Sequence, residues 1–539
     1  MAANGIPSRV ANARELNATV SPTRRRWGAA AIVATVIVSS GPSCGHTDNA
    51  APQLDSTNVV ASVVVLPESV SLAVSNTAQF AATIRATSGN VISGSDVSWR
   101  SSKPDVATVS SAGLVTALTP GNATVTATSS GTSGNASVSV VAAATCALIE
   151  GVSKKPTATL AKPGYLQSVT DPVFGTTITR ISGDPGTPIP VVGGTWSTVV
   201  YGNYPKDPAW NADQSLLLLK HTGNPSATNW LFLDGQNYRV LFARSGPRAV
   251  EARWHPTTPA IMLFVSADGS VGTWNPRTNL TTVKFTPSGY SGASLGNYEG
   301  NPSRDGRSVV VEAKRNFDAH LVAFAVDVDA ATKGPDIDLT AANITNLDWV
   351  SISPSGSYVV AYGVIDGTNE RTKVWRRDGT LVGYWQDYPL GHYDLGLDQS
   401  GNEIAFGAVS RGPLARHYIA RRLDTGAVLE LTGAVTSFNW HATTRAAARP
   451  EWGYAATNDN TGAPLDGEIY SIKLDGSGTV QRYVHHRSNN IDYNSAPLPT
   501  PSPDGRRVLF GSNWGAGSGK PMQAYVLDTR QLCPNGLPQ

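Results

Sequence analysis

Two short stretches of the chain combine the side chains that proton-transfer chemistry needs. Gly391 to Asp394 (GHYD) place an imidazole, a phenol and a carboxylate side by side, and His485 to Tyr493 contain two histidines, an arginine, an aspartate and a tyrosine. Elimination next to a carboxylate requires a base, an acid for the leaving oxygen and a cation that stabilises the intermediate. The candidate catalytic residues are His392 or His486 as the base, Tyr393 or Tyr493 as the acid, and Arg487 as the cation.

Other polar residues are expected to contact a ligand without taking part in chemistry. They are Tyr298, Glu299, Asp348, Asp394, His485 and Asp492, and most of them precede the turns of a repeated unit. The chain has no nucleophile elbow, phosphate loop or His-Glu-x-x-His zinc helix. The pairs Asp327/Asp329 and Asp336/Asp338 fit solvent-facing turns better than a calcium site. The sequence identifies no cofactor and leaves a metal open.

The composition predicts an all-β, turn-rich protein. Only 15% of the 539 residues are charged, the formal net charge is +2, and 52 glycines with 35 prolines interrupt short runs rich in valine, threonine, serine and alanine. No basic stripe is present to neutralise phosphates, so nucleic acid is not an expected partner.

The first 48 residues are expected to be an export signal. Three arginines, Arg24 to Arg26, precede a 13-residue run of apolar or small residues, Trp27 to Ser39, which is short for a membrane span. Cys44 follows in a Gly-Pro-Ser-Cys context that resembles a bacterial lipoprotein box, although the usual leucine is missing; lipidation of Cys44 and its removal with the signal stay open. We expect an exported protein at the outer cell surface, in the periplasm or outside the cell.

After a polar linker at residues 49–57, residues 58–142 have the texture of a β-sandwich, with short alternating strands and frequent turns. The segment Val97 to Val109 (VSWRSSKPDVATV), followed by Gly113 to Ala117 (GLVTA), resembles the bacterial group 2 Ig-like domain. That resemblance implies a spacer module at the cell surface, with Trp99 in its core.

Residues 143–539 repeat one unit of short strands. Tight turns recur seven times between Asp213 and Asp504, at intervals of 43 to 61 residues, and a second set of turns after the third strand also counts seven. Each unit exposes two apolar faces, so the copies must pack on one another in a ring. The predicted fold is therefore an Ig-like β-sandwich followed by a seven-bladed β-propeller.

The closure of this ring follows from one missing and one spare strand. The last unit lacks its outer strand, and Thr176 to Ile181 (TTITRI) has no partner of its own, so we expect it to complete the last blade. Closure brings together Cys146 and Cys533, which lie 387 positions apart, and predicts a disulfide between them. Cys44 then remains as the odd thiol.

The repeat resembles the TolB-type propeller, most faithfully at Ser502-Pro-Asp-Gly505 with Val508 to Phe510. Its texture is also similar to oligogalacturonate lyase, which implies cleavage of uronic-acid polymers by β-elimination. Leu498 stands where metal-using lyases of this kind carry a histidine, so a metal-dependent site is in doubt.

These observations lead to three hypotheses. In the first, the propeller binds a ligand, plausibly a carbohydrate, on its channel face. In the second, it is a polysaccharide lyase; whether the protein is an enzyme stays open. In the third, it is a protein-protein scaffold in an envelope complex. The expected partner is a polysaccharide or an envelope protein, with membrane contact only through a lipid on Cys44.

Overall fold

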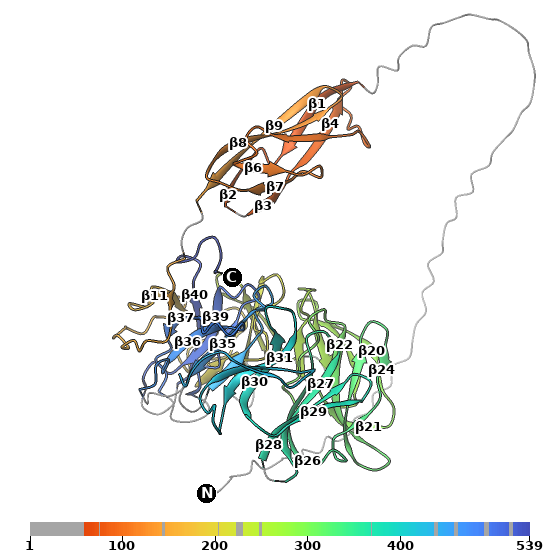
Figure 1. The fold of residues 1–539 in the computed structure, drawn as a ribbon, viewed down its shortest axis with the longest axis vertical. Coiled ribbons are helices and arrows are strands. Elements are labelled where there is room, and N and C mark those ends of the chain that lie inside the picture. The colour runs from red at the N-terminus through yellow and green to blue at the C-terminus, as the bar shows by residue number, and fades with distance from the viewer. Residues whose placement is uncertain are drawn as a thin grey trace, which may run out of the picture.

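This computed structural model describes residues 59–74, 76–142, 146–202, 204–222, 230–246, 251–367, 369–435, 440–457, 462–489, 495–516 and 521–538. The named elements are strands β1 to β40, and the all-β prediction is confirmed. Figure 1 shows β1 to β9 as one unit and the later strands as another. Within the described residues, no helix has the length and apolarity to cross a membrane. The predicted signal and Cys44 lie outside the described residues.

The first unit is a sandwich of short strands. Its sheets have the orders β1-β4, β2-β9-β8-β5 and β3-β7-β6. The strands are β1 (Val60–Leu66), β2 (Ser69–Ala73), β3 (Thr77–Gln79), β4 (Ala81–Ala86), β5 (Ser98–Ser101), β6 (Ala107–Val109), β7 (Leu114–Ala117), β8 (Gly121–Ser129) and β9 (Thr132–Val141).

Alternate residues of β8 point into the core of this sandwich, as expected for a sheet with one buried face. Trp99 is half-buried and packs against the core. Gly113 has φ +80°, and a Cβ there would lie 2.5 Å from the carbonyl oxygen of Phe80 and 3.0 Å from the Trp99 ring. Only glycine therefore lets this turn close over the tryptophan.

The second unit contains seven sheets in the described residues, each numbered here along the chain. Sheet one holds β13 (Val199–Tyr201), β14 (Leu216–Thr222), β15 (Trp230–Asp234) and β16 (Val240–Arg244). Sheet two holds β17 (Glu251–Trp254), β18 (Met262–Val265), β19 (Val271–Asn275) and β20 (Leu280–Phe285). Sheet three holds β21 (Tyr290–Ser294), β22 (Ser308–Arg315), β23 (Leu321–Asp327), β24 (Thr332–Lys333) and β25 (Ile337–Asp338).

The remaining sheets follow the same order from the centre outward. Sheet four holds β26 (Ile344–Ile352), β27 (Tyr358–Ile365), β28 (Asn369–Arg376) and β29 (Leu381–Trp385). Sheet five holds β30 (Leu390–Leu397), β31 (Glu403–Val409), β32 (Tyr418–Arg422) and β33 (Val428–Glu430). Sheet six holds β34 (Trp440–Thr443), β35 (Trp452–Thr457), β36 (Glu468–Lys473), β37 (Val480–His485) and β10 (Ile149–Glu150). Sheet seven holds β38 (Thr500–Pro501), β39 (Arg507–Ser512), β40 (Gln523–Asp528), β12 (Thr177–Arg180) and β11 (Ser168–Thr170).

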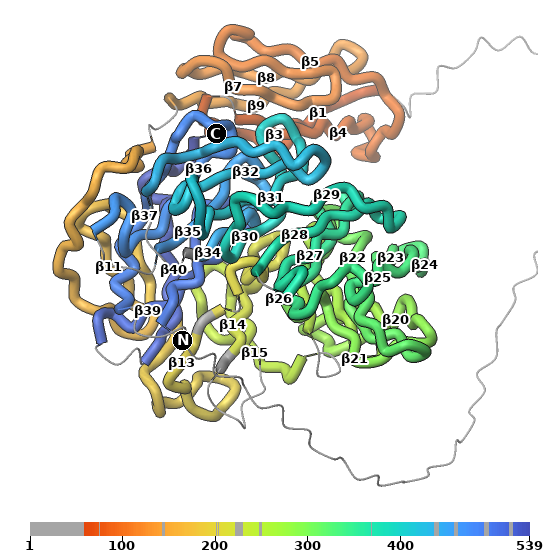
Figure 2. The backbone as a smooth tube through the Cα atoms, turned by 60° about the horizontal axis from the view of Figure 1, so that its bottom comes forward, coloured from red at the N-terminus to blue at the C-terminus, as the bar shows by residue number. Residues whose placement is uncertain are grey.

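The sheets pack face to face around a ring, with β26, β30 and β34 near its centre and β20, β24 and β11 at its periphery (Figure 2). Strands such as β35 are buried at every position, because a neighbouring sheet covers each face. One apolar cluster joins each neighbouring pair of sheets. The cluster that contains Leu509 and Val526 of sheet seven with Leu217 and Leu231 of sheet one closes the ring.

The predicted closure is confirmed by the pairing of β12 with β40, in which Thr177 lies opposite Asp528 and Arg180 opposite Tyr525. Two further strands from the start of the unit were not foreseen. β11 lies outside β12, and β10 pairs with β37 of sheet six. The disulfide between Cys146 and Cys533 is also present, with Cα atoms 4.4 Å apart. The chain therefore enters and leaves the ring at one seam.

Candidate ligand site at the channel mouth

The innermost strands bring polar and aromatic residues of five sheets together at one end of the channel. Tyr204 and Lys206 lie between β13 and β14, Glu299 lies between β21 and β22, and Asp348 and Trp349 are on β26. His392 on β30 and His441 on β34 complete the group. We call these seven residues the mouth cluster. They meet because equivalent ends of the innermost strands of a propeller face one side of the ring.

Lys206 is the central cation of the mouth cluster. Its Nζ atom lies 2.8 Å from Oε2 of Glu299 and 3.9 Å from the centre of the Trp349 ring. The side chain is only 3% exposed, so its charge is shielded from water and held between a carboxylate and an aromatic face. A buried cation in this position can stabilise negative charge on a ligand or hold Glu299 in place.

The imidazole of His392 is held by a hydrogen bond with Tyr204 and by stacking on the ring of His441. The hydroxyl of Tyr204 and Nδ1 of His392 form a hydrogen bond, and the His392 and His441 rings stack at 4.7 Å between centres. A break in the register of β30 between Gly391 and Asp394 turns His392 out of the regular strand, with φ +34°. Burial, followed by the charge of Lys206, lowers the pKa of His392. The pKa of His441 is held well below its ordinary value by burial and by His392, so both rings are neutral at pH 7.

Asp348 carries the unbalanced charge of the mouth. Its side chain is exposed to solvent, but the walls of the mouth displace part of its hydration, and this raises its pKa to about 6. The charge of Glu299 raises the pKa further, the charge of Lys206 opposes that effect, and Glu370 adds to it. One cation therefore faces three carboxylates. The net charge of this group is negative when all three carboxylates are ionised.

A second ionic network lies beside the mouth and is balanced. Lys220 Nζ lies 2.7 Å from Oδ2 of Asp207 and 2.7 Å from Oε1 of Glu251, and Arg253 pairs with the same two carboxylates. Burial tends to raise the pKa of Glu251, but the charges of Arg253 and Lys220 lower it to about 2. Arg253 also donates to the carbonyl oxygen of Tyr298 at 2.6 Å. This network holds the Tyr298 loop and adds no net charge.

The structure places the predicted residues Tyr298 and Glu299 at the mouth. Tyr298 is 61% exposed, with φ +69°, and the side-chain amide of Asn297 donates to the carbonyl oxygen of Asp348 at 2.9 Å. The loop before β22 is thus tied to β26. The phenol ring of Tyr298 is therefore exposed to solvent on a loop that is fixed to the backbone of Asp348.

Tyr393 and Asp394 require a correction, because both side chains are buried and bonded to other residues of the propeller. The hydroxyl of Tyr393 bonds to Thr372 Oγ1 at 2.8 Å, and its ring packs at 4.8 Å against Trp349. Burial raises the pKa of Tyr393, which makes it a poor proton donor. Asp394 is paired with Arg445 and accepts from the backbone N–H of Thr444 at 2.9 Å. Tyr393 is therefore fully buried, whereas the neighbouring His392 is only half-buried.

The group from His485 to Arg487 also requires a correction. These residues lie at the end of β37, the fourth strand of sheet six, and no contact in the described residues joins them to His392. Arg487 lies 2.9 Å from Oδ2 of Asp171, His485 contacts the carbonyl oxygen of Lys155 at 3.3 Å, and His486 Nε2 contacts that of Thr457 at 2.7 Å.

Burial lowers the pKa of His485 and of His486 to about 4. Their contacts with residues 155 and 171 tie the entering segment to sheets six and seven. We therefore assign them to the seam rather than to a catalytic site. The other two predicted residues of this loop, Asp492 and Tyr493, lie outside the described residues.

Four members of the mouth cluster were not predicted from the sequence as site residues: Tyr204, Lys206, Trp349 and His441. Tyr204 and Lys206 lie in a segment between two strands, where no periodic pattern marks a side chain that faces the channel. His441 follows Trp440, and tryptophans recur at this place in the repeat, so a structural role explains the position equally well. The sequence did offer one signal for this part of the cluster, because Lys206 is a charged residue in the segment that leads into the sheet.

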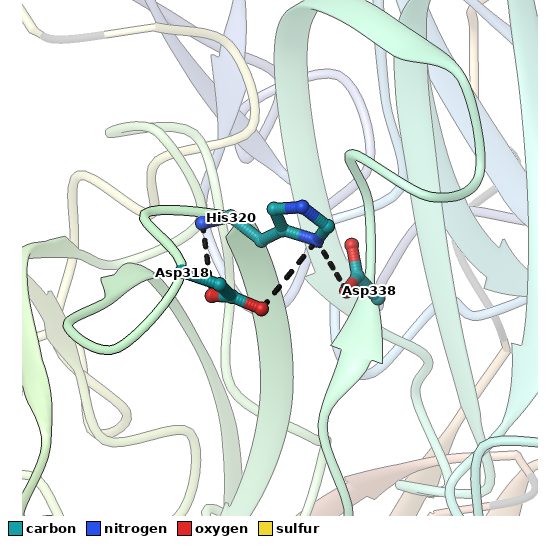
Figure 3. A group of neighbouring side chains, drawn as sticks. All are labelled: Asp318, His320 and Asp338. Carbon is teal, nitrogen blue, oxygen red and sulfur yellow. Dashed lines mark hydrogen bonds and ion pairs between the residues drawn. The ribbon is translucent and has the colours of Figure 1, made fainter.

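A separate group of potential metal ligands, Asp318, His320 and Asp338, lies at the outer part of sheet three (Figure 3). Nδ1 of His320 lies 2.7 Å from Oδ2 of Asp338. Arg315 donates to Oδ2 of both aspartates, at 2.5 Å and 2.8 Å. Because the guanidinium group already occupies these oxygens, the group is better described as an ion-pair network than as a metal centre.

Comparison with known proteins supports the sandwich directly. Residues 59–140 match the family model described as bacterial Ig-like domain (group 2). No curated protein matches the chain.

Solved structures with similar folds include an oligogalacturonate lyase in complex with manganese. It is 16% identical, with 68% of this chain and 96% of that chain covered and a TM-score of 0.49. TolB from Acinetobacter baumannii is 14% identical, with 54% and 64% covered and a TM-score of 0.31. The predicted resemblance to the Ig-like family is confirmed for residues 59–140.

Proposed function

We propose that this exported protein uses its Ig-like domain as a spacer and binds a carbohydrate at the mouth of the propeller channel. The bacterial Ig-like domain and the Cys146–Cys533 disulfide indicate export. The observation that supports binding is the combination at one mouth of exposed Asp348, exposed Tyr298 and half-buried His392 and Tyr204. Carboxylates accept hydrogen bonds from hydroxyl groups, and aromatic rings supply apolar contact area.

The charge of the mouth favours a neutral or amino sugar over a uronic acid. Lys206 is already paired with Glu299, and the charges around Asp348 are mainly negative. A polymer of uronic acids would bring further carboxylates into this surplus, whereas the ammonium group of a glucosamine unit would reduce it. Attachment to a membrane through Cys44, and the choice between periplasm and cell surface, remain proposals.

The proposal predicts an order of affinities for oligosaccharides of similar length. Calorimetric titration of the full chain is expected to give the tightest binding for oligomers of glucosamine, weaker binding for neutral glucose oligomers and the weakest for galacturonate. Asp348→Asn and Tyr298→Ala should each lower the affinity about tenfold, since each removes a direct contact. Asp329→Asn, which changes an exposed carboxylate on the outer part of sheet three, is the matched control. Equal affinity of the two mouth variants and the wild type would contradict the proposal.

The pKa of Asp348 predicts a pH dependence of binding. Since this pKa is raised to about 6, the carboxylate is ionised at pH 7 and mostly protonated at pH 5. Binding that depends on the ionised carboxylate is therefore expected to weaken between pH 7 and pH 5 in the wild type. In Asp348→Asn the same titration should be flat over this interval. A drop of equal size in the variant would assign the titration to another group.

One observation favours lyase activity as a second candidate function. Tyr204 is bonded to the neutral ring of His392, and Lys206 lies next to both rings, with its Nζ atom 5.3 Å from the centre of the Tyr204 ring. In an elimination, His392 or Tyr204 would take the proton next to the substrate carboxylate, the C–O bond would break, and the leaving oxygen would take up a proton. Ultraviolet absorbance of the unsaturated product, absent in His392→Asn and Tyr204→Phe, would establish this activity. Binding without product from any uronate polymer would support recognition alone.

A further inference from the structure

A pocket lies where the innermost strands end, near the turns that lead to the next strand of each sheet. Its volume is about 90 Å³. Six sheets each contribute one proline from the segment between their first two strands to the lining: Pro208, Pro256, Pro302, Pro354, Pro450 and Pro503. In sheet five, Leu395 and Leu397 take the equivalent place. The ring of turns therefore builds an apolar wall that is separate from the mouth cluster.

Two buried tryptophans complete this apolar wall. Trp210 and Trp254 are 1% and 2% exposed and line the pocket. Their indole N–H groups donate to the backbone, Trp210 to Gly235 at 3.2 Å and Trp254 to Ala209 at 3.1 Å. Because both polar atoms are already bonded, the rings offer only apolar atoms to a ligand.

Arg304 brings a positive charge to the pocket that no carboxylate neutralises by contact. It is half-buried, and its guanidinium group donates to the carbonyl oxygen of Ala447, but it forms no ion pair in the described residues. Glu451 acts on it from a distance. The other arginine of the lining, Arg445, is already paired with Asp394. Arg304 is therefore the available partner for an anion.

Asn301 supplies a second polar contact. Asn301 is one of the lining residues and is 2% exposed, and its buried carboxamide oxygen has no hydrogen-bond partner among the described residues. The backbone of Asn301 is held in place, because its N–H donates to Ser351 Oγ at 3.1 Å. A buried acceptor without a partner destabilises the protein until a donor satisfies it. A ligand with a hydroxyl group would do so.

We propose that this pocket binds a small apolar hydroxycarboxylate. The carboxylate pairs with Arg304, the hydroxyl group donates to Asn301, and the apolar body lies against the prolines, Trp210 and Trp254. A volume of this kind holds roughly six to nine water molecules at about 10–15 Å³ each, which corresponds to a single small aromatic or branched acid rather than a polymer. This site is independent of carbohydrate binding at the mouth.

Mandelate, phenylacetate and methyl mandelate test the proposal, because the second lacks the hydroxyl group and the third lacks the charge. Binding to the full chain can be followed by tryptophan fluorescence and confirmed by calorimetry. We expect mandelate to bind at least tenfold more tightly than methyl mandelate and several-fold more tightly than phenylacetate. An ester that binds as tightly as the acid would overturn the proposal, and so would a lack of mandelate binding at millimolar concentration.

Variants assign the two contacts. Arg304→Gln is expected to remove the preference for mandelate over its methyl ester, and Asn301→Ala the preference for mandelate over phenylacetate. Arg307→Gln is the matched control, since Arg307 follows on the same turn, its side chain is 57% exposed, and it does not line the pocket. If Arg304→Gln does not fold, the ester and acid still decide the question in the wild type. Unchanged mandelate affinity in a folded Arg304→Gln protein would contradict the assignment.

Discussion

Replacing Cys146 and Cys533 by serine is expected to lower the free energy of unfolding of the propeller by about 3–6 kcal/mol. The upper figure is the chain-entropy estimate for a loop of 387 residues, and strain or residual structure in the unfolded chain reduces it. Cys533 is fully buried at the seam where β12 pairs with β40. The sheet hydrogen bonds survive the substitution, but the unfolded chain gains the freedom that the disulfide removed.

The measurement is thermal and denaturant unfolding of the double variant beside the wild type, with and without a reductant. The reductant should destabilise the wild type to the level of the variant and leave the variant unchanged. Cys44→Ser is the control, because Cys44 takes no part in the disulfide. If the double variant unfolds at the same temperature as the oxidised wild type, ring stability depends on the β12–β40 pairing and the apolar cluster between sheets seven and one alone.

The ring itself could be predicted from the sequence because its signals are local. Ser502-Pro-Asp-Gly505 forms the expected turn: the N–H of Gly505 donates to the carbonyl oxygen of Ser502 at 2.8 Å, and Gly505 has φ +70°. A Cβ on Gly505 would lie 2.1 Å from the hydroxyl oxygen of Tyr454 in sheet six, so packing also requires glycine. Each unit repeats such requirements. The order of the sheets could therefore be predicted from the turn motifs along the sequence, without any knowledge of the distances between sheets.

The candidate site could be predicted only in part, because it depends on contacts between sheets. Positions that interrupt the repeat were predicted to be functional; the structure places His392 and the Tyr298 loop near one end of the channel, and their role in binding stays a prediction. The prediction failed for His485 to Arg487, whose interruption serves the segment that enters the ring at residues 155 to 171. A break in the repeat marks a position whose role differs from that of the repeated unit. Closure of the ring is also such a role, so a break does not by itself indicate a ligand site.

The proline pocket shows a signal that the sequence contained and that motif analysis passed over. Pro256, Pro302, Pro354 and Pro503 each precede or lie in the tight turn of their unit, and Pro450 lies just before the second strand of sheet six. Proline there fixes the backbone of the turn, which explains its repetition without any reference to a ligand. Only the ring arrangement makes their rings line one cavity. Once the prolines are seen to line one cavity, Arg304 and Asn301 can be identified as polar residues of the same lining.

Asp394→Ala is expected to destabilise the propeller by about 3–5 kcal/mol, because it leaves Arg445 without its partner in a largely buried place. Asp394 is 1% exposed, and Arg445 Nε donates to its Oδ2 at 2.9 Å. Asp424→Ala is the matched control, since Asp424 pairs with Arg422 of the same sheet where both side chains are about one-third exposed. That substitution should cost about 0–1 kcal/mol.

The lowered pKa of Asp394 predicts how the contribution of the Asp394–Arg445 pair to stability depends on pH. Burial tends to raise this pKa, but the charge of Arg445 and its hydrogen bonds hold it below the ordinary value of 3.8. The pair therefore contributes fully to stability above about pH 4 and loses its contribution as the pH falls through the lowered pKa. The gap in unfolding free energy between wild type and Asp394→Ala should narrow on acidification. If Asp394→Ala instead keeps the wild-type stability and loses carbohydrate binding, Asp394 contacts the ligand, as the sequence alone suggested.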